Sequence, residues 1–116
     1  MTLKVDVVQN TSGGPVTLTQ QSAAKAWNRV NASTTIVDSF NVSSVTDDGT
    51  ANTDTNFTSS MSNSNFSSSG DINYDNNGIT WHRLQTTSQV NTRQYIPTVP
   101  GFYDLEFGVH VQGDLA

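Results

Sequence analysis

The segment Gly101 to Val111, GFYDLEFGVHV, alternates apolar and polar side chains more cleanly than any other part of the chain. Successive side chains of a β-strand point to opposite faces, so this alternation predicts a strand with one buried side. The expected buried side carries Tyr103, Leu105, Phe107, Val109 and Val111, and the opposite side carries Asp104, Glu106, Gly108 and His110.

The stretch from Thr34 to Phe57 predicts a β-hairpin. Its first half alternates imperfectly, with Phe40 and Val42 expected to point inward and a β-bulge or bend expected at Ser43-Ser44. Asp48-Gly49 is a preferred turn pair, because Gly accepts positive φ and Asp tolerates it. The returning strand is expected to start over Thr53, Thr55 and Phe57.

Other segments predict further strands and loops. Leu3 to Gln9 alternates as a strand, and TSGGP predicts a turn before a short strand with Val16 and Leu18. QQSAAKAWNRV fits either a helical turn or a strand with Ala26, Asn28 and Val30 on one side.

Downstream of the hairpin, ITWHRLQ predicts a strand, with Ile79, Trp81 and Arg83 opposite Thr80, His82 and Leu84. SSMSNSNFSSSGD predicts a loop anchored inward by Met61 and Phe66. The run from Thr86 to Thr92 is polar, and Pro97 and Pro100 exclude a central strand around the residues between them.

Composition independently indicates an all-β domain with a thin core. The chain holds 14 Ser, 16 Thr and 12 Asn, side chains that disfavour helices and suit strands and turns. Only 34% of its 116 residues are hydrophobic, so burial against further copies of the chain is expected. With no cysteine, there is neither a disulfide nor a thiolate site.

Charge and hydropathy exclude several classes of partner. A net charge of −5 with only five basic residues disfavours binding to nucleic acid or to acidic membranes. The start of the sequence has no apolar leader region, and no apolar run approaches membrane-spanning length. Export by the general secretory route is therefore not expected.

Candidate catalytic and metal-binding residues are few, and we predict no enzyme activity. His82 and His110 lie 28 positions apart on polar strand faces, and no G-x-S-x-G signature supports a serine hydrolase. Asp71, Asn73, Asp75 and Asn77 alternate like ligands of a calcium loop, but Asn76 stands where an EF-hand needs Gly. We expect a plain turn there, and no cofactor or metal.

The remaining candidates concern sugars. Sequons at Asn10, Asn31, Asn41, Asn56 and Asn65 are expected from composition alone. Exposed aromatic rings can stack on sugars, which makes Trp27, Tyr74, Trp81 and Tyr95 candidates for glycan contact, although burial in the core is the commoner role for such residues.

Two stretches carry a resemblance to known proteins. TLKVDVVQNTSGGPVTLT resembles the N-terminal segment of phage tail-fibre and virion structural proteins. AAKAW, followed by DSFNVSSVTDDGT and TNFTSSMSNSNF, is similar to a module of marine and cyanobacterial phage fibres. The resemblance covers roughly residues 2 to 66.

This resemblance implies a non-enzymatic virion structural protein, made in the host cytoplasm, with a small antiparallel β-sandwich or jelly-roll-like fold in a homotrimer. Residues 1–20 are expected to attach it to capsid or tail proteins, and residues 21–116 to form the sandwich-like domain. Its place would be a short tail or collar fibre, a capsid-surface fibre or a decoration protein. A carbohydrate-binding module that reads a host surface glycan through Trp81 and Tyr95 is the alternative, and a small hydrolase is the third hypothesis. The expected attachment or oligomer interface is Leu3, Val5, Val7, Val16 and Leu18.

Overall fold

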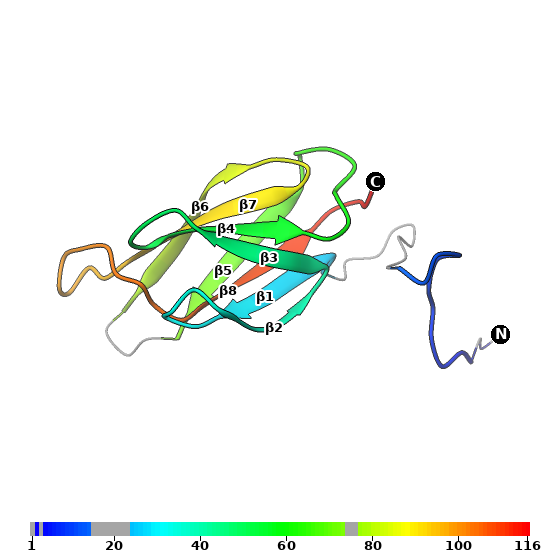
Figure 1. Cartoon of the computed structure of the whole chain (residues 1–116), viewed down its shortest axis with the longest axis horizontal. Helices are drawn as coiled ribbons and strands as arrows, with labels where there is room; N and C mark the ends of the chain where they lie inside the picture. The colour runs from blue at the N-terminus through cyan, green and yellow to red at the C-terminus, as the bar shows by residue number, and fades with distance from the viewer. Residues whose placement is uncertain (1, 3, 15–23, 74–76) are drawn as a thin grey trace.

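The computed structural model describes residues 2, 4–14, 24–73 and 77–116, and it contains eight β-strands (Figure 1). No helix occurs in these ranges, and so none that is long and apolar enough to cross a membrane. The strands are β1 (Ala26–Val30), β2 (Ile36–Phe40), β3 (Val42–Asp47), β4 (Asn52–Phe57), β5 (Ser67–Ile72), β6 (Ile79–Gln85), β7 (Gln89–Tyr95) and β8 (Phe107–Gln112).

The strands form two four-stranded antiparallel sheets, with strand orders β2-β1-β8-β5 and β3-β4-β7-β6. The sheets lie face to face, as Figure 1 shows, and each gives one inner face to the space between them. The expected all-β, sandwich-like fold is therefore confirmed. In β1 the strand alternative is confirmed as well, because Ala26, Asn28 and Val30 are all buried.

Between β2 and β3 the chain passes from one sheet to the other through a single residue, Asn41. Its φ is +54°, a left-handed conformation that Asn adopts more readily than most residues. The Asn41 amide donates to the carbonyl oxygens of Lys25 and Ser59 and accepts from the Ser59 N–H, so these bonds hold the corner in place.

This corner overturns one prediction for the segment. Phe40 does not point inward: it belongs to edge strand β2, pairs with Trp27 of β1 and is 42% exposed. The reversal at Asn41 puts the residues on its two sides into different sheets, so the alternation does not continue through it. Beyond the corner the predictions are confirmed, because β3 has a register shift between Val42 and Ser44 and leads into a hairpin with Gly49 at φ +120°.

The core lies between the sheets and is largely apolar on one side. It includes the expected anchors Met61 and Phe66, which are 2% and 7% exposed. Asn28 is the polar exception on the inner face of β1: its amide donates to Thr55 Oγ1 of the opposite sheet and accepts from the Val109 N–H. The core cluster is Ala26, Val30, Phe57, Met61, Phe66, Val90, Phe107, Val109 and Val111.

Three other segments differ from the sequence predictions. Ser67 to Asp71 were expected to lie in a loop but belong to edge strand β5, which pairs with β8. The polar run before Thr92 contains the start of the central strand β7. The C-terminal strand begins only at Phe107, and Tyr103 is 38% exposed because residues 102–106 form part of the connection from the opposite sheet.

The two ends of the sandwich differ. Lys25 and Val111 are bonded at one end, where the chain enters β1 and leaves β8. The opposite end, called the distal end here, holds the β3–β4 hairpin and the loop Pro97–Pro100. A backbone bridge between Ile96 and Gly101 closes this loop at its base. No strand runs through Pro97–Pro100, as expected for a segment bracketed by prolines.

The described N-terminal residues lie apart from both sheets (Figure 1). The strand expected over Leu3 to Gln9 is not formed: residues 4–10 pair with no strand in the described parts of the chain. Alternation alone is insufficient, because a strand needs a neighbour for its backbone hydrogen bonds. The strand expected at Val16 and Leu18 lies outside the described residues.

Candidate functional site

Three aromatic rings gather on the outer face of the β3-β4-β7-β6 sheet, at its distal end. The register of β6 and β7 places Trp81 opposite Arg93 and Ile79 opposite Tyr95, all on this face. Phe102 reaches over from the connection to β8, and its ring centre lies 5.9 Å from that of Trp81 and 5.3 Å from that of Tyr95. We call Trp81, Tyr95 and Phe102 the aromatic cluster.

Arg93 lies beside the aromatic cluster and contacts the Phe102 ring. Its guanidinium carbon lies 4.8 Å from the centre of the Phe102 ring, within the range of a cation–π contact. Trp81 is 40% and Phe102 is 45% exposed, so both leave ring surface open to solvent. Such surfaces are suited to stacking on the apolar face of a flat ligand.

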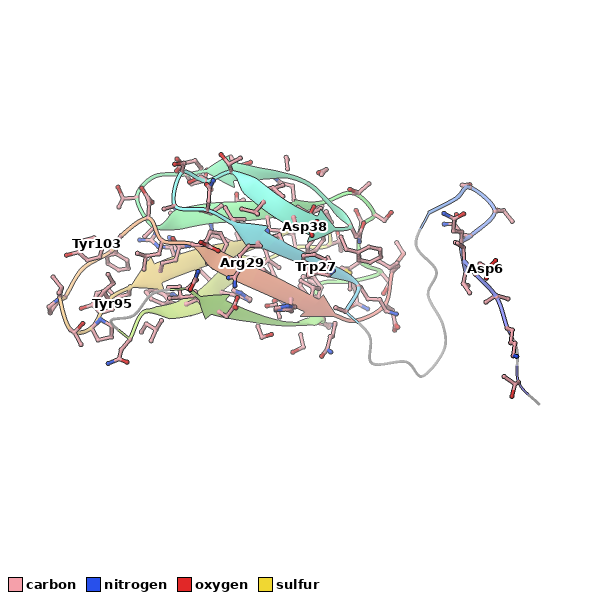
Figure 2. The ribbon with its side chains drawn as sticks, turned by 90° about the horizontal axis from the view of Figure 1, so that it is seen from below. Asp6, Trp27, Arg29, Asp38, Tyr95 and Tyr103 are labelled. Atoms are coloured by element: carbon pink, nitrogen blue, oxygen red, sulfur yellow. The ribbon has the colours of Figure 1, made fainter. Side chains whose placement is uncertain are left out.

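Sequence reasoning identified Trp81 and Tyr95 and missed Phe102. Both strand residues were selected for their ring chemistry, and Trp81 also follows from the alternation of β6. Phe102 joins them only through the fold of a connecting segment. Figure 2 shows Tyr95 and Tyr103 at the same end of the molecule, far from Asp6 of the N-terminal segment. Exposed Ile79, Val99 and Tyr103 extend the apolar surface at this end.

The other aromatic candidates do not join this cluster. Trp27 lies on the outer face of the opposite sheet, where it pairs with Phe40 and His110. On the same face Arg29 lies 3.5 Å from both Asp71 and Glu106 (Figure 2 labels Arg29 and Trp27). Tyr74 lies outside the described residues.

The edge strands β5 and β6 border a hollow of about 440 Å³ that contains His82. His82 was expected to face solvent, but it turns inward, where its Nδ1 and Ser68 Oγ share a hydrogen bond. Burial lowers the pKa of His82, which keeps the imidazole neutral. Gly70 makes room for the ring, because a Cβ there would lie 3.2 Å from His82 Nε2.

The Ser68–His82 pair lacks the further partner of a serine–histidine–carboxylate triad. His82 Nε2 is buried and has no hydrogen-bond partner among the described residues. A carboxylate that orients the imidazole is what makes such a histidine an effective base. His110, by contrast, is exposed on the outer face as expected.

The structure shows contacts for several residues of the calcium-type stretch and of the sequons. Asp71 is ion-paired with Arg29, and residues 74–76 of that stretch lie outside the described residues. The described ranges contain no group of three or more His, Cys, Asp or Glu side chains arranged to hold a metal. Among the sequons, Asn31 accepts from the Ser33 and Thr35 N–H groups, and Asn41 holds the corner between the sheets.

The proposed attachment residues are described in part. Val5 and Val7 are 54% and 68% exposed in the N-terminal segment, and neighbouring Val8 is 54% exposed. Leu3, Val16 and Leu18 lie outside the described residues. Comparison with known protein families, with curated proteins and with solved structures finds no match to this chain.

Proposed function

We propose that this chain is a non-enzymatic phage virion structural protein, attached to the particle through its N-terminal segment. The observation that carries the proposal is the exposure of Val5, Val7 and Val8 in a segment outside a sandwich whose sheets are already paired without it. Apolar side chains in such a position gain most by burial against another protein. The resemblance of residues 2 to 66 to phage fibre modules supports the same assignment.

The direction of the chain supports a display role, as a tail or collar fibre, a capsid-surface fibre or a decoration protein. The chain enters β1 at the end where Lys25 bonds Val111, and the aromatic cluster lies at the distal end. A protein held by residues before β1 therefore presents its distal end outward. The mature location is the virion, after synthesis in the host cytoplasm.

Attachment is tested with purified particles that lack the protein. The full chain is expected to co-sediment with them, and Val5→Ser combined with Val7→Ser and Val8→Ser is expected to abolish this. Gln9→Asn, an exposed polar change in the same segment, serves as the control. Undiminished binding of the triple variant would contradict attachment through this segment.

The same proposal includes a homotrimer, because the chain is poor in apolar residues for a domain of its length. Light scattering coupled to size exclusion is expected to give three times the mass of one chain. A stable monomer at micromolar concentration would refute the trimer and leave the attachment proposal intact.

A second candidate function is host recognition by carbohydrate binding, favoured by the exposed rings of Trp81 and Phe102 in the aromatic cluster. Trp81→Ala and Tyr95→Ala are expected to reduce adsorption to host cells. Phe40→Ala, which removes an exposed ring from the opposite sheet, provides the control. Equal adsorption by all three variants would exclude the aromatic cluster as the receptor contact.

A further inference from the structure

A second feature of the same outer face is a polar hollow of about 400 Å³ next to the aromatic cluster. Its floor is formed by side chains of the central strands β4 and β7, and its rim by the β3–β4 hairpin and by β6. We call it the amide hollow; the floor is Asn52, Asp54, Gln89 and Asn91, and the rim is Asp48, Arg83 and Leu84.

Side-chain hydrogen bonds hold the floor in a fixed arrangement. Asn91 Nδ2 donates to Asn52 Oδ1 at 2.9 Å and to Asp54 Oδ1 at 2.7 Å. Gln89 Nε2 donates to Asp54 Oδ2 at 3.1 Å. These planar groups come from rigid strands, so a ligand meets a preorganised surface and little ordering is required on binding.

Two groups of the amide hollow retain unused hydrogen-bonding capacity. Asn91 is 7% exposed, and its Oδ1 is buried without a partner in the described parts of the chain. A buried acceptor in this state is costly, and a ligand donor that reaches it removes that cost. Arg83 on the rim forms no ion pair within the described residues, where both ion pairs belong to Arg29.

The charges in the hollow select against an anionic ligand. Asp48 and Asp54 share a hydrogen bond that raises the pKa of Asp48, so the two carboxyl groups are already crowded. A hydroxyl group both donates and accepts, which matches the buried Asn91 Oδ1 and the Arg83 guanidinium together. Leu84, 58% exposed, offers an apolar surface beside these polar groups.

We propose that the amide hollow binds a neutral sugar unit with adjacent free hydroxyls, as part of an oligosaccharide that continues onto the aromatic cluster. The proposal rests on the second candidate function, carbohydrate binding. Asn91, Arg93 and Tyr95 are successive outward residues of β7. With a rise of about 3.4 Å per residue, Asn91 and Tyr95 lie roughly 14 Å apart along the strand, the reach of a short oligosaccharide.

The test uses the full chain and a panel of neutral and uronic-acid oligosaccharides. Isothermal titration is expected to show binding of at least one neutral oligosaccharide and of none of the uronic acids. The neutral ligand is then titrated into ¹⁵N-labelled protein, where the side-chain amide signals of Asn91 and Gln89 are expected to shift.

Variants then separate the hollow from the rings. Asn91→Ala and the exposed Arg83→Ala are each expected to weaken binding about tenfold, the loss of one good hydrogen bond. Asn56→Ala, which removes an amide on the same face outside the hollow, is the control and is expected to bind as wild type. Thermal unfolding checks that each variant is folded. If Asn91→Ala does not fold, the binding of Arg83→Ala alone tests the amide hollow.

The outcomes distinguish the two levels of the proposal. Loss of binding in Trp81→Ala with full binding in Arg83→Ala and Asn91→Ala would overturn the amide hollow and leave carbohydrate binding by the rings. Preference for the uronic acids would overturn the ligand class. No binding of wild-type protein to any oligosaccharide of the panel would overturn both the hollow and the second candidate function.

Discussion

The central strands β8 and β7 lie in opposite sheets and hold their sheets together in different ways. β8 places Phe107, Val109 and Val111 on its inner face, and all three are at most 1% exposed. The inner face of β7 carries Val90, Thr92 and Gln94, which are buried to the same degree. The inner faces of the two strands are therefore equally buried, but that of β8 is apolar and that of β7 is mostly polar.

This difference has an energetic consequence. Apolar burial stabilises by about 25 cal/mol per Å², so the inner face of β8 contributes directly to folding. Buried polar groups are at best neutral unless they are bonded, and Thr92 Oγ1 and Gln94 Nε2 have no partner among the described residues. β7 is therefore held mainly by its backbone pairing with β4 and β6 and by the side-chain hydrogen bonds of its outer face to β4.

The largest effect is expected on the β8 side. Phe107→Ala removes a side chain that is 1% exposed, and we expect a loss of about 3–5 kcal/mol in the free energy of unfolding. Urea unfolding followed by tryptophan fluorescence measures it. Phe102→Ala, a 45% exposed phenylalanine, is the control and should cost far less. A similar loss of unfolding free energy in the two variants would contradict the difference between the two layers.

The next effect concerns the bond that joins the layers. Asn28→Ala removes the donor to Thr55 Oγ1 and leaves the Val109 N–H without its acceptor. We expect about 1–3 kcal/mol of destabilisation in the same urea assay. An unchanged midpoint would mean that the polar contact across the interior contributes nothing.

A smaller effect of opposite sign is expected within β7. Thr92→Val replaces an unpartnered buried hydroxyl by a methyl group of similar size, which should stabilise by about 1 kcal/mol. Thr55→Val on neighbouring β4 is the matched control, because it deletes an acceptor that Asn28 uses and should destabilise. Changes of the same sign in the two variants would contradict this account of the polar layer.

The smallest effect is a pH dependence from His82. Burial lowers its pKa below the ordinary value of 6.5, so the unfolded chain takes up a proton before the folded protein does. Stability contributed by neutral His82 is therefore complete above about pH 6.5 and falls as the pH decreases below it. Melting temperatures from about pH 8 to pH 5 should decline less in His82→Gln than in wild type. A His82→Gln profile parallel to that of wild type would refute the assignment.

The same contrast explains which elements were predictable from the sequence. The part of β8 from Phe107 to Val111 was predicted because its apolar residues alternate, and β6 was predicted for the same reason. β7 was missed because Thr92 and Gln94 on its inner face look like loop residues, and their burial depends on strands distant in sequence. Phe40 was placed wrongly because one left-handed residue, Asn41, redirects the chain.

The candidate site likewise contains residues that the sequence predicted and residues that it did not. Trp81 and Tyr95 were selected from the sequence by residue type, and the strand register brings them to one face. Phe102 and the amide hollow depend on contacts between segments far apart in the chain: Gln89 and Asp54, for example, are bonded across 35 positions. Periodicity carries no information on such pairs.

The closed loop Pro97–Pro100 makes the sandwich a scaffold for grafting. Its base is fixed by the bridge between Ile96, which is 2% exposed, and Gly101, and the four residues between them are exposed. The chain enters and leaves the two sheets at the opposite end. A foreign peptide inserted between Thr98 and Val99 would thus be displayed at the distal end without crossing the core, and sequence variation there can change what the surface offers while the fold stays intact.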